Sequence, residues 1–337
     1  MKGHLPRLSQ LHLRFWQPKR SMVGVYIDMF TIAPRLEKVT IDKDGIYNIR
    51  VIVPFHQLSS FARKNVLDQL NELNNSLPAF SNLVYLETRW KSTDSPFDPP
   101  KPCITLPRLE VLIISFRVLV HRYCPVEAFF EQLILPSIKK IVVDGDIYGA
   151  VRAISSMISR SLPCDPLTLS INGEISARPG SLTLLLHLTP QLEHLEIPLL
   201  PFDDLSNLLT ASESPVVAPN LQSLHIYVLQ CTTDFYSSSL IATGEMLSNA
   251  GVDFRLKSLK LIFRTTDACH STYRILQQSL PVDELDDKVL AHIKLCKRRF
   301  LKEILDLQIE TPNASEPESD ARQYKALEPI ESAFQHH

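Results

Sequence analysis

Apolar and polar residues alternate in a short pattern whose clearest copy is the stretch 106–114, LPRLEVLII. In this stretch Leu109, Leu112 and Ile114 fit the spacing L-x-x-L-x-L. The last two of these positions are two residues apart, so their side chains leave the same face of an extended chain. Pro107 has no backbone N–H and disfavours a helical conformation at the residue before it. The pattern therefore predicts a short strand behind a proline, and an incoming helix that ends where the stretch begins.

The same pattern recurs along the chain and predicts a repeat architecture. Its first apolar residue stands at ten positions: Leu8, Leu36, Leu58, Leu83, Leu109, Ile138, Cys164, Leu192, Leu221 and Leu256. Six copies carry a proline just ahead of the strand: Pro6, Pro34, Pro107, Pro136, Pro190 and Pro219. Most copies begin about 20 to 29 residues after the previous one, which is the period of leucine-rich repeats. The copies at Leu58, with Arg63 in the third apolar position, and at Cys164 fit least and are the first that we expect to fail.

The segments between these strands mostly have the period of a helix. Residues 65–77 carry an asparagine at the N-cap position and leucines on one stripe, and Pro78 follows as a stop. Residues 125–135 begin with proline at a favoured first helical position and place Glu127 in the first turn. Weaker helical patterns cover residues 146–161, 181–188, 202–211 and 239–250. Such units predict an α/β leucine-rich-repeat solenoid, a horseshoe with parallel strands on its concave face and helices outside.

Two stretches interrupt the period. Residues 91–102 contain four prolines and read as a surface loop. Residues 42–53 have an Asp-Gly turn signal between apolar runs, which predicts a small inserted hairpin. Insertions of this kind are either partner contacts or merely tolerated surface excursions.

The repeat pattern divides the chain into three parts. Residues 1–265 form the predicted repeat array. Two helices, over residues 268–280 and 282–308, are expected to cap its apolar end within a unit spanning 266–310. The polar, proline-bearing stretch 311–337 is predicted to be a disordered tail.

Composition narrows the functional classes. The net charge of −2 gives no strong field of one sign, so neither nucleic acid nor a membrane is an expected partner. Six scattered cysteines without a C-x-x-C pair fit reduced thiols in the cytoplasm or the nucleus. The N-terminus opens directly on a repeat strand without the apolar core of a signal peptide. We therefore expect a cytoplasmic or nuclear protein.

Catalytic and cofactor-binding signatures are missing from the sequence. It has no G-x-S-x-G, H-E-x-x-H, Walker or G-x-G-x-x-G motif. Cys124 near His121 is better explained by a turn, and His187 and His194 lack the regular spacing of metal ligands. The basic run 297–299 is either a nuclear address or, more simply, the solvated face of a helix. We expect a non-enzymatic protein with no cofactor and no metal.

The residues between the apolar positions of each strand should line the concave surface. In the middle of the array they form an apolar stripe flanked by an aromatic residue and cations, which is typical of a protein-binding centre. The predicted partner-binding residues are Tyr85, Arg89, Val111, Ile113, Lys140 and Val142. The alternative is that the loop 91–102 folds over the stripe.

Nearly all of the chain up to about residue 265 resembles the leucine-rich-repeat region of fungal, basidiomycete-type F-box proteins. The stretches that carry the resemblance are LPRLSQLHLRFW (5–16), APRLEKVTI (33–41), PFHQLSSF (54–61), FSNLVYLE (80–87), LPRLEVLII (106–114) and TPQLEHLEI (189–197). In that family the repeats hold a target protein, and an F-box ahead of them binds the Skp adaptor of a cullin-based ubiquitin ligase. No L-P-x-E-[IL] pattern of an F-box precedes the repeats here, and only Asn172 matches the usual asparagine after a strand.

The resemblance implies a protein–protein interaction module that recognises substrates for an F-box-like ubiquitin-ligase adaptor, with a Skp-type adaptor as partner only if an F-box lies upstream. The alternative is a repeat-only scaffold or decoy with no link to ubiquitin. A hydrolase in a degenerate repeat frame is a further alternative, for which the sequence shows no nucleophile constellation.

Overall fold

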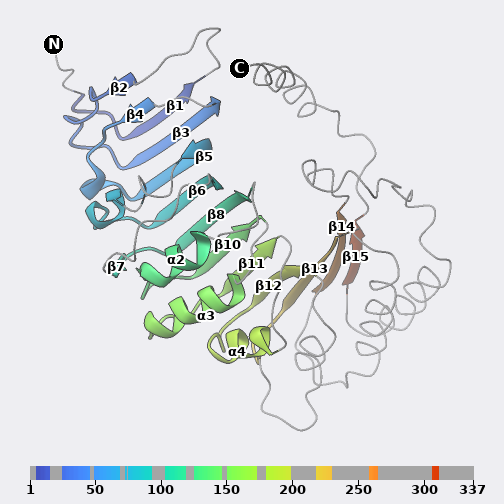
Figure 1. Ribbon diagram of the computed structural model, residues 1–337. Coiled ribbons are helices and arrows are strands. Elements are labelled where there is room, and N and C mark those ends of the chain that lie inside the picture. Colours follow the sequence, from blue (N-terminus) through green and yellow to red (C-terminus); the bar gives the residue numbers. More distant parts are fainter. Residues whose placement is uncertain are drawn as a thin grey trace, which may run out of the picture.

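The computed structural model describes residues 5–15, 25–45, 49–68, 73, 75–92, 103–118, 125–145, 150–172, 180–198, 218–229, 258–264 and 306–310. Within these residues the fold is α/β. The fold contains one sheet of eleven strands. These strands lie side by side in the order of the sequence (Figure 1). Every pairing in this sheet is parallel. The predicted α/β class with parallel strands is therefore confirmed.

The strands of the main sheet repeat at short intervals. They are β1 (Gln10–Phe15), β3 (Lys38–Gly45), β5 (Ser60–Asp68), β6 (Tyr85–Ser92), β8 (Val111–Val118), β10 (Lys140–Asp144), β11 (Thr168–Asn172), β12 (His194–Pro198), β13 (Ser223–Leu229), β14 (Ser258–Arg264) and β15 (Asp306–Glu310). Each of the ten pattern copies found in the sequence has a strand in this sheet. The sheet is thus built from one repeated unit.

The entry to each strand repeats the same hydrogen bonds. The backbone N–H groups of Lys139 and Lys140 both donate to the carbonyl of Glu110, at 2.9 Å each, and most of the neighbouring pairs repeat this shared acceptor. The strands are therefore paired in equivalent register, with Tyr85 opposite Val111 and Val111 opposite Lys140. Because side chains alternate along a strand, equivalent register places corresponding residues of all copies on the same face.

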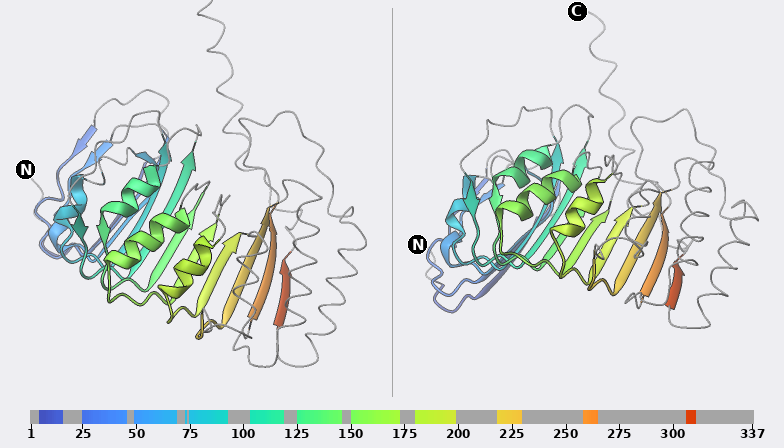
Figure 2. Two further views of the ribbon diagram at one scale, coloured as in Figure 1. Left: turned by 60° about the horizontal axis from the view of Figure 1, so that its bottom comes forward. Right: turned by 90° about the horizontal axis from the view of Figure 1, so that it is seen from below.

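A second layer covers one face of the sheet. It contains the helices α2 (Pro125–Gln132), α3 (Ala150–Arg160) and α4 (Ser181–His187), which lie on the same side of the strands (Figure 2). Two small parallel sheets, β2 (Val25–Ile27) with β4 (Ile49–Val51) and β7 (Ile104–Thr105) with β9 (Leu133–Ile134), and the 3₁₀ turns η1 (Phe55–Gln57) and η2 (Leu77–Ala79) supply the other connections.

The core lies between these two layers. Leu109, Leu112 and Ile114 are fully buried, and Phe129 and Phe130 of α2 are buried in the same cluster. This single apolar cluster takes residues from almost every copy between β3 and β13. Burial of the triplets against the helical layer is the main force that stacks the copies, because no unit has enough partners to bury its own apolar face.

The prolines ahead of the strands act in turns rather than as helix stops. In all six proline-bearing copies, the first apolar residue donates its backbone N–H to the carbonyl three residues earlier, over 3.0 to 3.3 Å. Proline then occupies the second position of a β-turn, where its fixed φ is favoured. The residues before Leu106 form strand β7, so the expectation of an incoming helix there is wrong.

The predicted helix over residues 65–77 is wrong at its start, and residues 69–72 and 74 of it lie outside the described residues. Residues 65–68 continue strand β5, which pairs with β3 on one side and β6 on the other. Among the later residues, Leu73, Asn75 and Ser76 are helical, and Leu73 and Leu77 are buried as expected. Pairing on both edges of β5 outweighs the helical propensity of its last residues.

The predicted hairpin over residues 42–53 is also wrong. Strand β4 pairs in parallel with β2, placing Val51 opposite Ile27, and does not return along β3. The two short strands thus belong to successive connections on the helix side of the fold. The described residues of the helix predictions over 125–135, 146–161 and 181–188 agree with α2, α3 and α4 to within a residue at most ends. The exceptions are Leu133 and Ile134, which form β9, and Leu135, which follows it.

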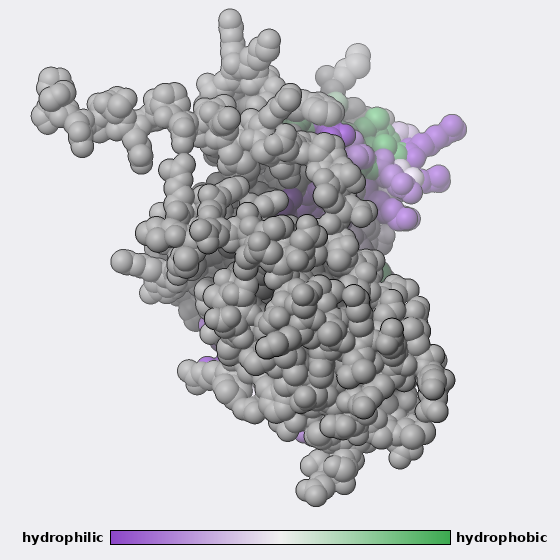
Figure 3. Space-filling model, turned by 90° about the vertical axis from the view of Figure 1, so that its right-hand side faces the viewer, coloured by the Kyte–Doolittle hydropathy of each residue, from purple (hydrophilic) through white to green (hydrophobic). Residues whose placement is uncertain are grey.

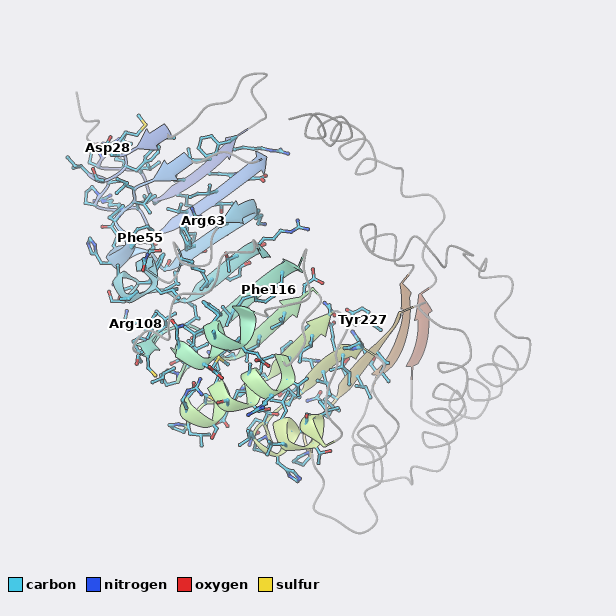
Figure 4. All side chains as sticks on the ribbon, in the orientation of Figure 1. Asp28, Phe55, Arg63, Arg108, Phe116 and Tyr227 are labelled. Atoms are coloured by element: carbon cyan, nitrogen blue, oxygen red, sulfur yellow. The ribbon has the colours of Figure 1, made fainter. Side chains whose placement is uncertain are left out.

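The two copies that fit the pattern least behave differently. The Leu58 copy forms β5 in the middle of the array, with Arg63 half-buried at the third inward position (Figure 4). The long apolar stem of arginine lets the guanidinium reach the edge of the core. The other copy begins at Pro166 rather than Cys164, because Pro166 is buried and Leu167 is 37% exposed.

The main sheet includes a strand beyond residue 265. Residues 306–310 form β15, which pairs with β14 and sets Leu307 opposite Leu259. The predicted capping helix over 282–308 is therefore wrong at its end, where Leu307 and Ile309 alternate with polar residues. The predicted loop 91–102 is wrong at its start, because Lys91 and Ser92 belong to strand β6. The rest of that loop, the predicted helices over 202–211, 239–250 and 268–280 and the tail 311–337 lie outside the described residues.

Candidate functional site

The face of the sheet that points away from the core is the candidate site. We call it the non-core face, and in the described side chains it is formed by alternate strand residues from Gln10 in β1 to Ser258 in β14. The side chains on it are chemically mixed. Figure 3 shows the molecule from the right-hand side of Figure 1, and the few described residues visible in it are likewise both hydrophilic and hydrophobic. Local clusters, rather than one field of charge, therefore define what this face can do.

The structure brings the six predicted partner-binding residues together on three adjacent strands, β6, β8 and β10. In the first row Val111 lies between Tyr85 and Lys140, and in the second row Ile113 pairs with Val142. Arg89 follows two residues later, opposite Ser115. Paired positions on neighbouring strands lie about 5 Å apart, so these side chains form one continuous patch. We call these six residues the central patch.

The apolar part of the central patch is only half-buried. Val111, Ile113 and Val142 have intermediate exposure, whereas Leu112 and Val143, their neighbours on the core side, are fully buried. Lys140 beside them is exposed. Among the described residues, this stripe is therefore available for contact.

Tyr85 is held by an internal interaction at the edge of the central patch. Its hydroxyl donates to Glu87 Oε2 over 2.8 Å, and Lys64 Nζ lies 3.6 Å from the same oxygen. Burial, and then the hydrogen bond to Glu87 and the charge of that carboxylate, raise the pKa of Tyr85 far above its usual value. The hydroxyl of Tyr85 is therefore already hydrogen-bonded to Glu87, and a partner would contact the ring of Tyr85.

A second cluster on the non-core face centres on Glu196 of β12. Its Oε2 accepts hydrogen bonds from Ser170 Oγ at 2.5 Å and from Tyr227 Oη at 3.3 Å (Tyr227 is labelled in Figure 4). Its Oε1 lies 2.9 Å from His225 Nδ1, and His225 Nε2 lies 3.2 Å from Ser223 Oγ. We call these five residues the Glu196 network.

The Glu196 network is built by strand register. Ser170, Glu196 and His225 occupy equivalent positions of β11, β12 and β13. Ser223 and Tyr227 lie two residues on either side of His225 and therefore on the same face. Ser170 and Tyr227 are almost fully buried, with exposed fractions of 3% and 6%, which sets this cluster apart from the central patch.

The network keeps Glu196 ionised. Burial opposes the charge, but hydrogen bonds from Ser170 and His225, the nearby His225 charge and a bond from Tyr227 outweigh it and lower the pKa of Glu196 below its ordinary value. An ionised carboxylate only accepts hydrogen bonds, so His225 Nδ1 carries the proton. In the neutral imidazole, Nε2 is then an acceptor that faces the Ser223 hydroxyl.

The sequence alone did not identify this network. Glu196 and His225 are 29 residues apart, and only their equivalent place in successive repeats brings them together. The signal was nevertheless in the sequence. Between the apolar positions of one copy stand Ser223 and His225, and Glu196 stands between the apolar positions of the preceding copy. Aligning neighbouring copies by their apolar positions would have shown that these three residues lie side by side on the sheet.

The two histidines considered as metal ligands in the sequence, His187 and His194, do not lie together. His187 ends α4 on the helix side, whereas His194 begins β12 on the non-core face. No group of three or more metal-ligating side chains occurs within the described ranges, and no helix there is long and apolar enough to span a bilayer. Cys124, His121 and the basic run 297–299 lie outside the described residues.

Comparisons with known proteins do not assign this chain to a family. No protein-family model matches the sequence, and a comparison with curated proteins gives no match.

Proposed function

We propose that this chain is a leucine-rich-repeat protein that binds another protein through the central patch on its non-core face. The observation that carries the proposal is the half-buried apolar stripe of Val111, Ile113 and Val142 beside Tyr85 and the cation Lys140. Apolar surface flanked by aromatic and polar side chains is characteristic of interface centres. The patch is formed by β6, β8 and β10 of three successive copies, so a partner would contact side chains of three strands at once.

The repeat geometry supports a horseshoe for this proposal. Neighbouring strands are about 4.8 Å apart, whereas packed helices need about 8 to 10 Å. Units with a strand on one side and a helix on the other, as around α2, α3 and α4, therefore stack more tightly on the strand side. Such stacking favours a curved solenoid in which the non-core face is concave and can surround part of a partner.

On the basis of the resemblance to fungal F-box proteins, we propose that the partner is a substrate of a ubiquitin ligase. In this proposal the chain is a cytoplasmic or nuclear, F-box-like recognition module that works by binding, without a cofactor. It would contact a Skp-type adaptor only through an F-box upstream of the repeats. The alternative is a repeat-only scaffold or decoy that binds the same kind of target without the ligase.

The central patch can be tested with the double variant Val111→Asp/Ile113→Asp. Proteins captured by the tagged full chain are compared between this variant and the parent by quantitative mass spectrometry. Two carboxylates in a half-buried apolar patch should remove the bound target, with at least a tenfold loss of recovery, because unpaired charge is costly at an interface centre. Unchanged capture by the folded variant would show that the patch is not the binding site.

The matched control is Leu184→Asp, which makes the same kind of change at a 56% exposed leucine of α4 on the helix side. Its capture profile should equal that of the parent. Circular dichroism and thermal unfolding establish that each variant is folded. Skp and cullin in the captured complex support the ligase proposal, and their absence from a complex that retains the target supports the scaffold.

A further inference from the structure

Three side chains of the Glu196 network lie in the order of a serine nucleophile, its base and the group that orients the base. Ser223 Oγ lies 3.2 Å from His225 Nε2, and His225 Nδ1 lies 2.9 Å from Glu196 Oε1. Each imidazole nitrogen thus faces the partner that base catalysis by a serine–histidine–carboxylate relay requires. The same side chains in a purely structural network would not need this order.

The surroundings of Glu196 preorganise the relay. Ser170 and Tyr227 both donate to Oε2 and leave Oε1 for the imidazole. With its carboxylate fixed in this way, Glu196 selects the tautomer in which His225 Nε2 accepts from the Ser223 hydroxyl. The neighbouring His194 pairs in register with Ser223, yet its Nε2 is 3.9 Å from Glu193 Oε2, and the nitrogen that accepts from the Ser223 hydroxyl is Nε2 of His225.

The relay is open to reagents. The side chains of His225 and Glu196 are 25% and 29% exposed, so the end of the network that carries Ser223 reaches the surface of the non-core face. The buried end, formed by Ser170 and Tyr227, holds the geometry. A small electrophile can therefore approach Ser223 without displacing the groups that orient the base.

We propose that Ser223 is a nucleophile that accepts an acyl group from a carboxylic ester, an activity beyond the proposed protein binding. The Ser223 Oγ–H proton passes to His225 Nε2 as the Oγ–C bond forms. The ester C–O bond then breaks, and the alcohol leaves with that proton. A water molecule then gives one proton to His225 Nε2 as its oxygen bonds to the acyl carbon. The Oγ–C bond breaks as that proton returns to Ser223 Oγ, and the carboxylic acid is released.

The geometry also limits the substrates. Strand β13 pairs with β12 and β14 on its two sides, so the ladder engages its backbone N–H groups, which are then not available to stabilise an oxyanion. One such donor is worth a factor of about 10² to 10³ in rate. We therefore assign activated esters with good leaving groups as the substrate class, and slow release of the acyl group, rather than peptide hydrolysis.

The test treats the full chain with p-nitrophenyl acetate and, separately, with a fluorophosphonate probe. The probe labels activated serines through an Oγ–P bond as fluoride leaves. We expect one label per chain on the peptide that contains Ser223, seen by intact mass and peptide mapping. Ser223→Ala should remove this label, and His225→Gln should slow labelling by at least tenfold.

Glu196→Gln separates catalysis from packing. It keeps the shape of the side chain but no longer holds His225 in the required tautomer, so labelling should fall by at least tenfold and its pH profile should change. The matched controls are His194→Gln, which changes the neighbouring histidine, and Ser60→Ala, which removes a serine at the equivalent position of β5. Both controls should label at the parental rate.

The proposal is overturned if Ser223 in the folded parent chain labels no faster than Ser60. It is equally overturned if Ser223→Ala keeps the label or Glu196→Gln labels at the parental rate, because the network would then be structural only. These outcomes would not affect the proposal of protein binding. Ser223 lies outside the central patch, so Ser223→Ala should capture the same target as the parent. Loss of capture by Val111→Asp/Ile113→Asp, conversely, should not alter labelling.

Discussion

At the scale of single residues, Glu196 is a carboxylate held by three different donors from β11 and β13. Burial alone would raise its pKa, but the hydrogen bonds that it accepts lower the pKa below 4.5, its ordinary value. The same contacts explain why a charged residue is tolerated among the nearly buried Ser170 and Tyr227. Its charge therefore contributes to stability as well as to the orientation of His225.

We expect the contribution of Glu196 to stability to depend on pH. A carboxylate whose pKa is lower in the folded than in the unfolded state stabilises the fold above the unfolded-state pKa, and this stabilisation is lost as the pH falls through the folded-state pKa. The difference in free energy of unfolding between the parent and Glu196→Gln should thus be constant above pH 4.5 and shrink below it. Urea unfolding at a series of pH values measures the difference.

Ser170→Ala is the matched control for this pH dependence. It removes one of the donors that lower the pKa of Glu196, so the folded-state pKa moves toward the unfolded-state value, and the loss of stability on acidification should be smaller and end at a higher pH than in the parent chain. A parent–variant difference that stays constant down to the acid unfolding of the chain would contradict the role assigned to Glu196.

At the scale of elements, the turn before each strand fixes where the strand begins and therefore its register with the neighbouring strands. Its backbone hydrogen bond recurs in all six proline-bearing copies. Side chains also connect successive turns: Arg108 Nη1 donates to Asn82 Oδ1 at 3.0 Å, and Ser137 Oγ donates to the Pro107 carbonyl at 2.7 Å (Arg108 is labelled in Figure 4). The turns therefore form a ladder of their own beside the sheet.

Replacing a turn proline by alanine should lower stability modestly. Proline restricts the unfolded chain in a conformation that the turn already needs, so Pro107→Ala and Pro190→Ala should each reduce the free energy of unfolding by about 0.4 to 1 kcal/mol. The two turns precede β8 and β12, which are separated by β10 and β11, so the effects should add. Urea unfolding of both single variants and the double variant tests this prediction, and an unchanged midpoint in all three would refute it.

At the scale of the whole molecule, burial grows from the first strand of the sheet toward its middle. Leu11, Leu13 and Phe15 of β1 are half-buried, whereas Leu112 and Ile114 of β8 are fully buried. Strand β1 pairs on one side only and β8 on both sides. Since each repeat contacts its immediate neighbours, local stability should follow this gradient.

Leucine-to-alanine substitutions should reveal the gradient. Leu112→Ala leaves a cavity in a fully packed site and should cost about 2 to 5 kcal/mol, whereas Leu13→Ala should cost less than half as much because its environment is already partly solvated. Denaturant unfolding measures both values, and hydrogen exchange should show faster opening of β1 than of β8. Equal costs at the two sites would contradict this graded packing.

Local patterns predicted a large part of the fold and of the central patch. The leucine triplets placed ten strands of the main sheet, and their alternation assigned Val111, Ile113 and Val142 to one face. Such predictions succeed because the period of two and the turn chemistry of proline are properties of a few adjacent residues. The same local reading failed at residues 65–68, where pairing with β3 and β6 overrides a helical pattern, and at residues 49–51, which pair with β2.

The sequence by itself determined the repeated unit, its parallel strands and the face on which each strand residue lies. Only the tertiary structure decided which residues of different copies meet, because register across strands depends on hydrogen bonds between segments some 30 residues apart. Glu196 of β12 meets the Ser223–His225 pair of β13 only through that register. For the same reason Lys64 of β5 approaches Glu87, which accepts the hydrogen bond of the Tyr85 hydroxyl within β6.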